Sequence, residues 1–342
     1  MKRKTIICAA LTVSLSAFLL AGCKPATTVT SEVQSEPVVS VVTSELPETG
    51  SEGIEMIDRA GNTIVVPEEC NRIVSMAPSV TEILLDLGLR DKIVACDTYS
   101  GYSAFASDLP EGIPQFDMMA PDNEQIIALN PDIVITTGMS YAGGEDVYSA
   151  VKASGVCVAD IPSSASIADI KEDLRFLGTA LNVSDEVEKI ISDMDVAEAE
   201  IKSLSDGITE KKTVLYIMSV PTPDYPDVYT CGKGTYMDEI FTLTGLKNIA
   251  GDIEYEWPAM SEEDIIAANP DVIIVGDTYT PDAVDAVLAL DGWGGITAIK
   301  NKAVYLIDGD AFNQPNQYVM NSAYEIATSV YPEVYADMVK PF

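Results

Sequence analysis

Histidine is absent from the 342 residues of this chain, and arginine occurs only five times. Histidine is the commonest general base in enzymes and a leading ligand for zinc, copper and haem iron. Arginine is the side chain best suited to binding carboxylates and phosphates through two parallel hydrogen bonds. The composition therefore disfavours acid–base catalysis, a metal centre held by the protein, and a ligand of high negative charge.

Motifs that carry catalysis are also missing. The chain has no G-x-S-x-G sequence, and residues 232–235, Gly-Lys-Gly-Thr, lack the spacing and the Lys-Ser/Thr ending of a phosphate-binding loop. We therefore expect no enzymatic activity, no catalytic residues, no resident cofactor and no metal site.

Basic residues are scarce relative to acidic ones. Lys and Arg number 20, whereas Asp and Glu number 54, which gives a formal net charge of −34 at pH 7. Nucleic-acid binding needs a basic surface that neutralises phosphates, so nucleic acid is excluded as a partner. The electrostatic field of this net negative charge also opposes the binding of an anionic ligand, unless a local basic pocket overcomes it.

Four cysteines follow residue 23, and they are widely separated. Cys70, Cys96, Cys157 and Cys231 form no C-x-x-C pair, so the sequence indicates neither a zinc site nor a redox motif. We interpret them as small buried hydrophobic residues. A disulfide between two of them remains an open alternative, because exported proteins form such bonds.

The first residues have the pattern of an export signal. Residues 2–4 are basic, and residues 5–20 form an apolar run that is short for a membrane-spanning helix. Residues 20–23, Leu-Ala-Gly-Cys, resemble a bacterial lipobox, in which cleavage leaves Cys23 as a lipidated N-terminus. Residues 1–22 are then a lipoprotein signal peptide, although an ordinary signal peptide is the alternative. Acyl chains contribute about 0.8 kcal/mol per buried methylene, enough to anchor the protein to the outer face of the cell membrane.

Residues 23–54 are rich in Thr, Ser, Val, Pro and Glu and almost free of aromatic residues. Such a segment cannot bury enough apolar surface to offset its ordering entropy, so it is predicted to be a disordered tether. The remainder exceeds the usual size of a single hydrophobic core, which predicts two lobes with two cores.

Alternating strand and helix patterns begin the folded part. Residues 72–76 form a short apolar strand pattern, residues 81–88 have helical spacing closed by glycine, and residues 92–95 return to a strand pattern. A second unit follows, with a helix at 124–129 ended by Asn-Pro and a strand at 132–135. This alternation predicts an α/β fold with parallel sheets.

Both units recur later in the chain. Residues 263–274 match residues 124–135 almost position for position, and residues 237–246 repeat the helix that ends at Gly88-Leu89. Two repeats in the same order predict a duplicated, two-lobed body.

One long helix is predicted between the lobes. Residues 184–206 carry apolar side chains at intervals of three and four, and glycine follows at position 207. A helix of this length spans roughly 30 Å. We therefore predict Rossmann-like lobes at 55–183 and 207–342, joined by a stiff connection that permits only small lobe movements.

The sequence resembles the helical-backbone class, or class III, of periplasmic binding proteins of ABC importers. The resemblance covers residues from about 55 to 340. It rests on the lipobox, the tether, Ser-Met-Ala-Pro-Ser-Val-Thr-Glu at 75–82, the paired E-x-I-I-A-x-N-P-D motifs and the single connecting helix. The resemblance implies an extracytoplasmic, monomeric, non-enzymatic protein that captures cobalamin, a ferric siderophore or haem. It also implies delivery to a permease dimer with its ATPase, and a membrane attachment through the lipid alone.

Within this class the likeness is greatest to cobalamin binders. They share a Tyr-Ser pair, here Tyr99-Ser100, a Trp-Pro pair, here Trp257-Pro258, and a run that corresponds here to residues 230–233, Thr-Cys-Gly-Lys. Met118 departs from the tryptophan that they carry. The class also implies that one glutamate on each lobe docks on the permease, which corresponds to Glu124 and Glu263. First-turn helix acids favoured by the helix dipole are the alternative explanation of this pair.

The cleft is expected between the lobes, at the carboxyl ends of the parallel strands. Loops in those places carry aromatic and polar side chains, for each of which burial in a core is the alternative. The predicted ligand contacts are Tyr99, Tyr102, Phe116, Met118, Tyr141, Tyr229, Trp257, Asp310 and Phe312.

The scarcity of arginine ranks the possible ligands. A neutral or weakly cationic corrinoid such as cobalamin suits the amides, tyrosines and Asp310 better than haem or a ferric catecholate does. The predicted cargo is therefore a cobalt corrinoid. A hydroxamate or other ferric siderophore is the first alternative, and a surface sensor or adhesin without transport is a distant one.

Overall fold

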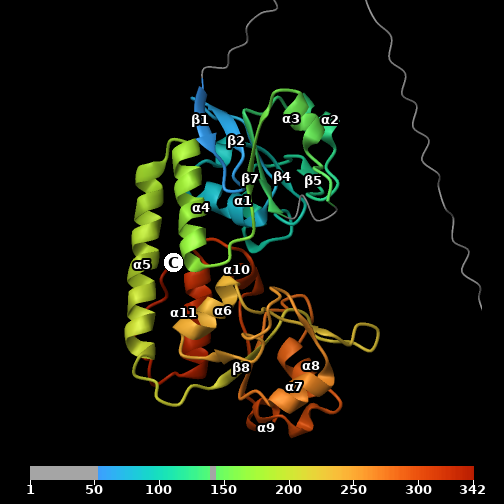
Figure 1. Cartoon of the computed structure of the whole chain (residues 1–342), viewed down its shortest axis with the longest axis vertical. Coiled ribbons are helices and arrows are strands. Elements are labelled where there is room, and N and C mark those ends of the chain that lie inside the picture. The colour runs from blue at the N-terminus through green and yellow to red at the C-terminus, as the bar shows by residue number, and fades with distance from the viewer. Residues whose placement is uncertain (1–52, 139–143) are drawn as a thin grey trace, which may run out of the picture. The chain divides into compact units, whose positions relative to one another are not determined.

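The structure is a computed structural model that describes residues 53–138 and 144–342 (Figure 1). Cys23 and Tyr141, two of the predicted site residues, lie outside this described part. The described chain begins with an antiparallel hairpin of β1 (Gly53–Ile57) and β2 (Thr63–Pro67). Gly53 and Ile54, which the sequence analysis assigned to the tether, belong instead to β1 and pair with Pro67 and Val66.

The first lobe contains a five-stranded parallel sheet in the order β5-β4-β3-β6-β7. Its central strands are buried on both faces, as expected for parallel sheets covered by helices. The strands are β3 (Ile73–Ser75), β4 (Ile93–Asp97), β5 (Gln115–Phe116), β6 (Ile133–Thr137) and β7 (Cys157–Ile161). The helices are α1 (Pro78–Asp86), α2 (Asn123–Ala128), α3 (Ser149–Ala153) and α4 (Ile167–Ala180), with 3₁₀ turns at Arg90–Lys92 and Ala104–Asp108.

The second lobe contains a four-stranded parallel sheet in the order β10-β8-β12-β13 and a separate antiparallel pair, β9 with β11. The strands are β8 (Thr213–Ile217), β9 (Val228–Tyr229), β10 (Lys247–Asn248), β11 (Ala259–Met260), β12 (Val272–Val275) and β13 (Val304–Leu306). The helices are α6 (Tyr236–Leu243), α7 (Glu262–Ala268), α8 (Ala283–Leu288), α9 (Thr297–Asn301), α10 (Gly309–Asn313) and α11 (Val319–Val330), with a 3₁₀ turn at Trp293–Gly295. The predicted α/β fold with parallel sheets is confirmed.

Helix α5 (Ser184–Ser205) runs alongside both lobes (Figure 1). It packs against α4 of the first lobe and against α6 and α11 of the second. Its buried face repeats the predicted spacing of three and four residues, with Val187, Ile191, Met194 and Ile201 pointing inward. The long connecting helix predicted at 184–206 is confirmed, and its length matches the prediction to within one residue.

The repeated Asn-Pro-Asp motif has the same structure in both lobes. Asn130 and Asn269 follow α2 and α7, and each has a left-handed backbone with a φ of 46°, which asparagine tolerates better than most residues. The aspartate two positions later turns back to the sheet. Asp132 accepts the N–H directly before β3 at 2.8 Å, and Asp271 accepts the first N–H of β8 at 2.9 Å. Each motif therefore ends a helix and fixes the start of the neighbouring strand.

The predicted division into two cores is only partly right. One continuous cluster of buried side chains runs through both lobes and α5, and includes Leu84, Ile191 and Phe241. Smaller clusters cover the opposite face of each sheet, around Val134 in the first lobe and Ile273 in the second. The lobes share a core because α5 presents one apolar stripe to helices from both.

The four cysteines of the described part are free thiols in the structure. Cys70, Cys96 and Cys231 are buried, as predicted, whereas Cys157 is partly exposed. None of the helices found at 53–138 or 144–342 has the length and apolar character needed to cross a membrane.

Candidate functional site

A seam of polar side chains joins the lobes. Asn316 donates from Nδ2 to Glu82 Oε2 at 2.6 Å, and Gln317 donates to the Asp86 carboxylate one turn further along α1. Gln314 Nε2 lies 3.4 Å from Ser103 Oγ, at the edge of hydrogen-bond distance. The segment after α10 therefore lies against α1 and against the loop that follows β4.

The seam is reciprocal. Glu82 on α1 accepts from the second lobe, while Glu239 on α6 accepts the N–H of Ile167 in the first lobe at 2.7 Å. The two glutamates occupy equivalent positions of the repeated helix, since each lies six residues before the glycine that closes it, Gly88 or Gly245. The duplication therefore supplies one crossing hydrogen bond in each direction.

Asp310 lies where the seam meets the predicted ligand loops. Its carboxylate accepts a backbone hydrogen bond from Ala104, just after the Tyr99–Ser103 turn of the first lobe. Burial and the neighbouring Asp308 carboxylate raise the pKa of Asp310 above its ordinary value, and its charge in turn raises the pKa of Tyr279. Asp310 therefore interacts electrostatically with Tyr279 of its own lobe and with the backbone at Ala104 of the other.

The first-lobe rim is the turn after β4. Tyr99 and Tyr102 are strongly exposed there, Tyr102 to 73%. The turn is held from below by Asp97, whose carboxylate accepts the N–H of Ser100 at 3.0 Å and the Ser100 hydroxyl. Burial raises the pKa of Asp97 in spite of these bonds. The two tyrosines therefore project from an ordered turn into solvent, and their contact with a ligand stays a prediction.

Tyr229 and Trp257 form a second group, on the β9–β11 pair. Tyr229 is 54% exposed and pairs in register with Ala259, two positions after Trp257. Trp257 is half-buried and packs against the shared core. Backbone hydrogen bonds from Thr230 to Pro258 at 3.1 Å keep these segments together. The structure brings these two predicted residues close to each other in this segment of the second lobe.

Three predicted ligand contacts are core residues instead. Phe116 and Met118 lie in the cluster that packs on one face of the first sheet. Phe312 is completely buried, with its ring centroid 4.9 Å from that of Tyr216 and 5.6 Å from that of Phe241. Buried side chains present no surface to a ligand, so we correct the role of all three to packing. Phe116 on β5, Met118 just after it and Phe312 on α10 point inward.

Tyr279 is an exposed aromatic residue that the sequence analysis did not single out. It follows β12 by four residues and is 77% exposed, and the charge of Asp310 raises its pKa. The repeat gives no signal for it, because Tyr141 in the first repeat aligns with Thr280 and not with Tyr279.

The predicted permease-docking residues occupy matching places. Glu124 lies in the first turn of α2 and Glu263 in the first turn of α7, and both are exposed. Each helix starts with a side-chain cap. Asp122 accepts the N–H of Gln125 at 3.0 Å, and the Ser261 hydroxyl accepts the N–H of Asp264. The exposed glutamates are therefore not needed as caps.

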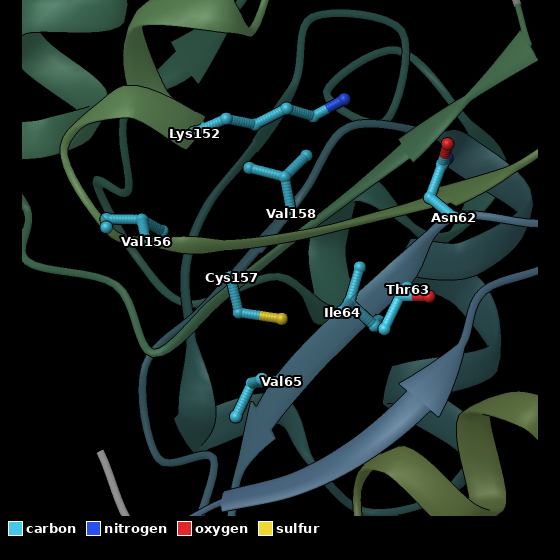
Figure 2. Close-up of a pocket in the computed structure, with 9 residues that line it drawn as sticks. Asn62, Thr63, Ile64, Val65, Lys152, Val156, Cys157 and Val158 are labelled. Atoms are coloured by element: carbon cyan, nitrogen blue, oxygen red, sulfur yellow. The ribbon is translucent and has the colours of Figure 1, made fainter. Parts of the chain in front are cut away.

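A cavity of about 370 Å³ lies away from the seam, between β2 and β7 (Figure 2). Its lining is mixed, with Ile64 and Val65 from β2 beside polar groups such as Asn62 and Lys152. Lys152 at its rim forms ion pairs with Asp146 and Asp160, at 3.0 and 3.2 Å. None of the predicted ligand contacts lines this cavity, so it is distinct from the candidate site. In the described part, no group of three or more Cys, Asp and Glu side chains is arranged to hold a metal ion.

Residues 73–311 match the family described as periplasmic binding protein. The chain belongs to this family. A Bacillus subtilis (strain 168) protein described as an uncharacterized ABC transporter substrate-binding lipoprotein, YvrC, is 29% identical over 343 residues, covering 98% of this chain and all of that protein. A vitamin B12-binding protein of Vibrio parahaemolyticus is 26% identical over 260 residues, covering 76% of this chain and 89% of the relative.

The fold is shared with a solved structure of the molybdate-bound periplasmic binding protein MolA of Haemophilus influenzae. The TM-score is 0.72 at 20% identity, over 83% of this chain and 93% of that one. The recognition made from the sequence is confirmed. The chain is an extracytoplasmic substrate-binding protein of the ABC-importer type, and it is not an enzyme.

Proposed function

We propose that this protein captures a neutral or weakly cationic corrinoid of the cobalamin class and delivers it to an ABC permease dimer with its ATPase. The observation that carries the proposal is the composition of the seam. Its facing side chains are carboxylates, amides and hydroxyls, namely Glu82, Asp86, Asp310, Ser103, Gln314, Asn316 and Gln317, and this set contains no cation.

The charge of this set opposes anionic cargo. No side chain of this set attracts an anion, and each ionised carboxylate in it repels a propionate, a molybdate or a ferric catecholate, since like charges interact strongly where burial lowers the dielectric constant. A corrinoid presents peripheral amides that donate and accept hydrogen bonds, and a flat ring that suits tyrosine and tryptophan. A relative at 26% identity is named for vitamin B12, which agrees with this choice.

We further propose that Cys23 carries the lipid anchor and that Glu124 and Glu263 dock on the permease. The relative YvrC is described as a lipoprotein, which supports the first part. The equivalent, exposed positions of the two glutamates support the second, because a symmetric dimer offers two equivalent landing sites.

Fluorescence titration tests the cargo. Trp257 is half-buried beside Tyr229, so a ligand at the rim should change its emission, whereas Trp293 is 3% exposed in the second-lobe core and should stay constant. Cyanocobalamin, dicyanocobinamide, ferrioxamine B, haemin and molybdate are titrated into the wild type and into Trp257→Phe. A saturable change with the two corrinoids, lost in Trp257→Phe, is the expected result.

Other outcomes assign another cargo. A response to ferrioxamine B without one to the corrinoids identifies a ferric hydroxamate binder. A response to haemin or molybdate overturns the charge argument as a whole. If calorimetry detects binding of none of these ligands, the corrinoid proposal fails.

A further inference from the structure

Asp277 makes an unusual number of hydrogen bonds to two loops. It lies two residues after β12 and is 7% exposed. Its Oδ1 accepts the N–H groups of Tyr279 at 3.1 Å and Thr280 at 2.9 Å. Its Oδ2 accepts the N–H of Val220 at 2.9 Å and the Thr280 hydroxyl at 2.7 Å. One carboxylate therefore fixes both the turn after β12 and the loop after β8.

The electrostatics favour a permanent anchor. Burial alone would raise the pKa of Asp277, but the N–H and hydroxyl donors from Val220, Thr280 and Tyr279 hold it below the ordinary value for aspartate. Hydrogen bonds that stabilise the ionised form act in this direction. The carboxylate thus stays charged, and its four acceptor bonds persist, across the neutral pH range.

The turn that Asp277 holds carries Tyr279, whose ring is 77% exposed at the carboxyl end of β12. Such a ring on a free loop would lose rotational and backbone freedom on binding a ligand, and that entropy would reduce the affinity. A ring on a turn that is already fixed loses less. The four hydrogen bonds of Asp277 therefore have a consequence for binding as well as for folding.

We propose that Asp277 is a positioning residue for cargo binding, and that it acts by holding Tyr279 at the second-lobe rim, where the ring contacts the cargo. The identity of the cargo rests on the function proposed above, whereas the positioning does not. The arrangement resembles that of the first lobe, where Asp97 holds the turn that carries Tyr99 and Tyr102.

The order of the turn can be measured without any ligand. Chymotrypsin cleaves after exposed tyrosines when the local backbone opens, and mass spectrometry identifies each cut. Asp277→Asn removes one acceptor oxygen and places an amide against donor N–H groups, so cleavage after Tyr279 should accelerate about tenfold. Cleavage after Tyr102, in the other lobe, should not change. Asp285→Asn removes the same charge from an exposed position on α8 and is the matched control.

A double-mutant cycle tests the link to binding. The dissociation constant is measured by calorimetry for the wild type, Asp277→Asn, Tyr279→Ala and the double variant, with any ligand of the titration panel that binds the wild type. If Asp277 acts through Tyr279, each single change weakens binding about tenfold and the double variant is no weaker than Tyr279→Ala. A residue that only stabilised the fold would give additive losses and a matching drop in melting temperature.

The outcomes separate the two parts of the proposal. Unchanged cleavage after Tyr279 in Asp277→Asn overturns the positioning role. Faster cleavage with unchanged affinity in both single variants overturns the contact between Tyr279 and the cargo. If no ligand of the panel binds the wild type, the proposed function fails and the ligand role of Tyr279 fails with it, while the cleavage rates still decide whether Asp277 orders the turn.

Discussion

The two lobes share their framework and differ at their rims. In both, a left-handed asparagine ends the repeated helix, and an aspartate of the same motif fixes the start of the adjacent strand. Gly88 and Gly245 also close equivalent helices with positive φ values of 73° and 84°. The duplication is therefore conserved in the parts that determine how helix connects to strand.

In each lobe a buried aspartate holds the turn that carries exposed tyrosines, but the two aspartates have different hydrogen-bond partners. Asp97 lies within a buried chain of hydroxyls, with Ser100 bonded in turn to Thr81 at 3.0 Å, and burial raises its pKa. Asp277 is held mostly by backbone N–H groups, and its pKa is lowered. Asp97 thus belongs to the core of the first lobe, whereas Asp277 connects loops of the second. Substitutions in the second-lobe turn should therefore destabilise the fold less than substitutions in the first-lobe turn.

The largest expected effect tests the symmetry of the exposed helices. Reversing the charge of both predicted docking residues, Glu124→Arg with Glu263→Arg, should abolish uptake by whole cells because the permease contacts of both lobes are lost. Ligand affinity of the purified protein should remain at the wild-type value, since both side chains lie outside the seam. Each single reversal should reduce uptake by a similar amount.

Two results would contradict this symmetry. A double variant that loses affinity as well as uptake would place the glutamates at the ligand. A strongly unequal effect of the single variants would mean that only one lobe docks through its α2 or α7 helix.

The next effect separates core from rim. Phe312→Ala removes a fully buried ring that packs on Tyr216 and Phe241, so the free energy of unfolding should fall by about 3–5 kcal/mol. Tyr102→Ala, at an exposed rim position, should change stability by less than about 0.5 kcal/mol while weakening ligand binding. Urea unfolding followed by circular dichroism measures both. A loss of less than about 1 kcal/mol in Phe312→Ala would contradict the packing role of this ring.

A smaller effect tests the shared framework. Asp132→Ala leaves the N–H groups of Asn71 and Arg72 without their acceptor, and Asp271→Ala leaves the N–H and hydroxyl of Thr213 without theirs, so each should cost about 1–3 kcal/mol. The two losses should agree within about 0.5 kcal/mol if the motif does the same work in both lobes. Asp193→Ala, on the exposed face of α5, is the control without such a bond. If the urea midpoints of Asp132→Ala and Asp271→Ala differ widely, the motif does not contribute equally to the stability of the two lobes.

Sequence alone predicted the framework because its causes are local. A helix pattern stopped by Asn-Pro, a glycine closing α1 and a three-and-four stripe on α5 each act within a few neighbouring residues. The site was predicted less well. Phe312 and Asp310 are two residues apart on α10, yet one is in the core and the other at the seam. Which side of so short a helix faces inward is decided by packing against distant strands.

The role of Asp277 was not predicted, for a related reason. Nothing near Asp277 in the sequence shows that its carboxylate reaches Val220, fifty-seven positions earlier. Such a bond follows from the order of β8 and β12 as neighbours in the sheet, which only the structure provides. Once strand order is known, acidic residues just after neighbouring strands become candidates for holding both loops.

The smallest expected effect concerns Glu82, the seam glutamate on α1. Burial raises the pKa of Glu82 from 4.5 to about 7, against the opposing hydrogen bond from Asn316. A carboxyl whose pKa is raised in the folded state favours folding when the pH lies below the ordinary pKa of glutamate. This contribution to the free energy of unfolding is lost as the pH rises through about 7. The melting temperature should therefore fall by a few degrees between pH 6 and pH 8, and Glu82→Gln should reduce that fall. If the fall between pH 6 and pH 8 is as large in Glu82→Gln as in the wild type, the titration of Glu82 does not contribute to it, and Asn316 donates to an ionised carboxylate throughout this range.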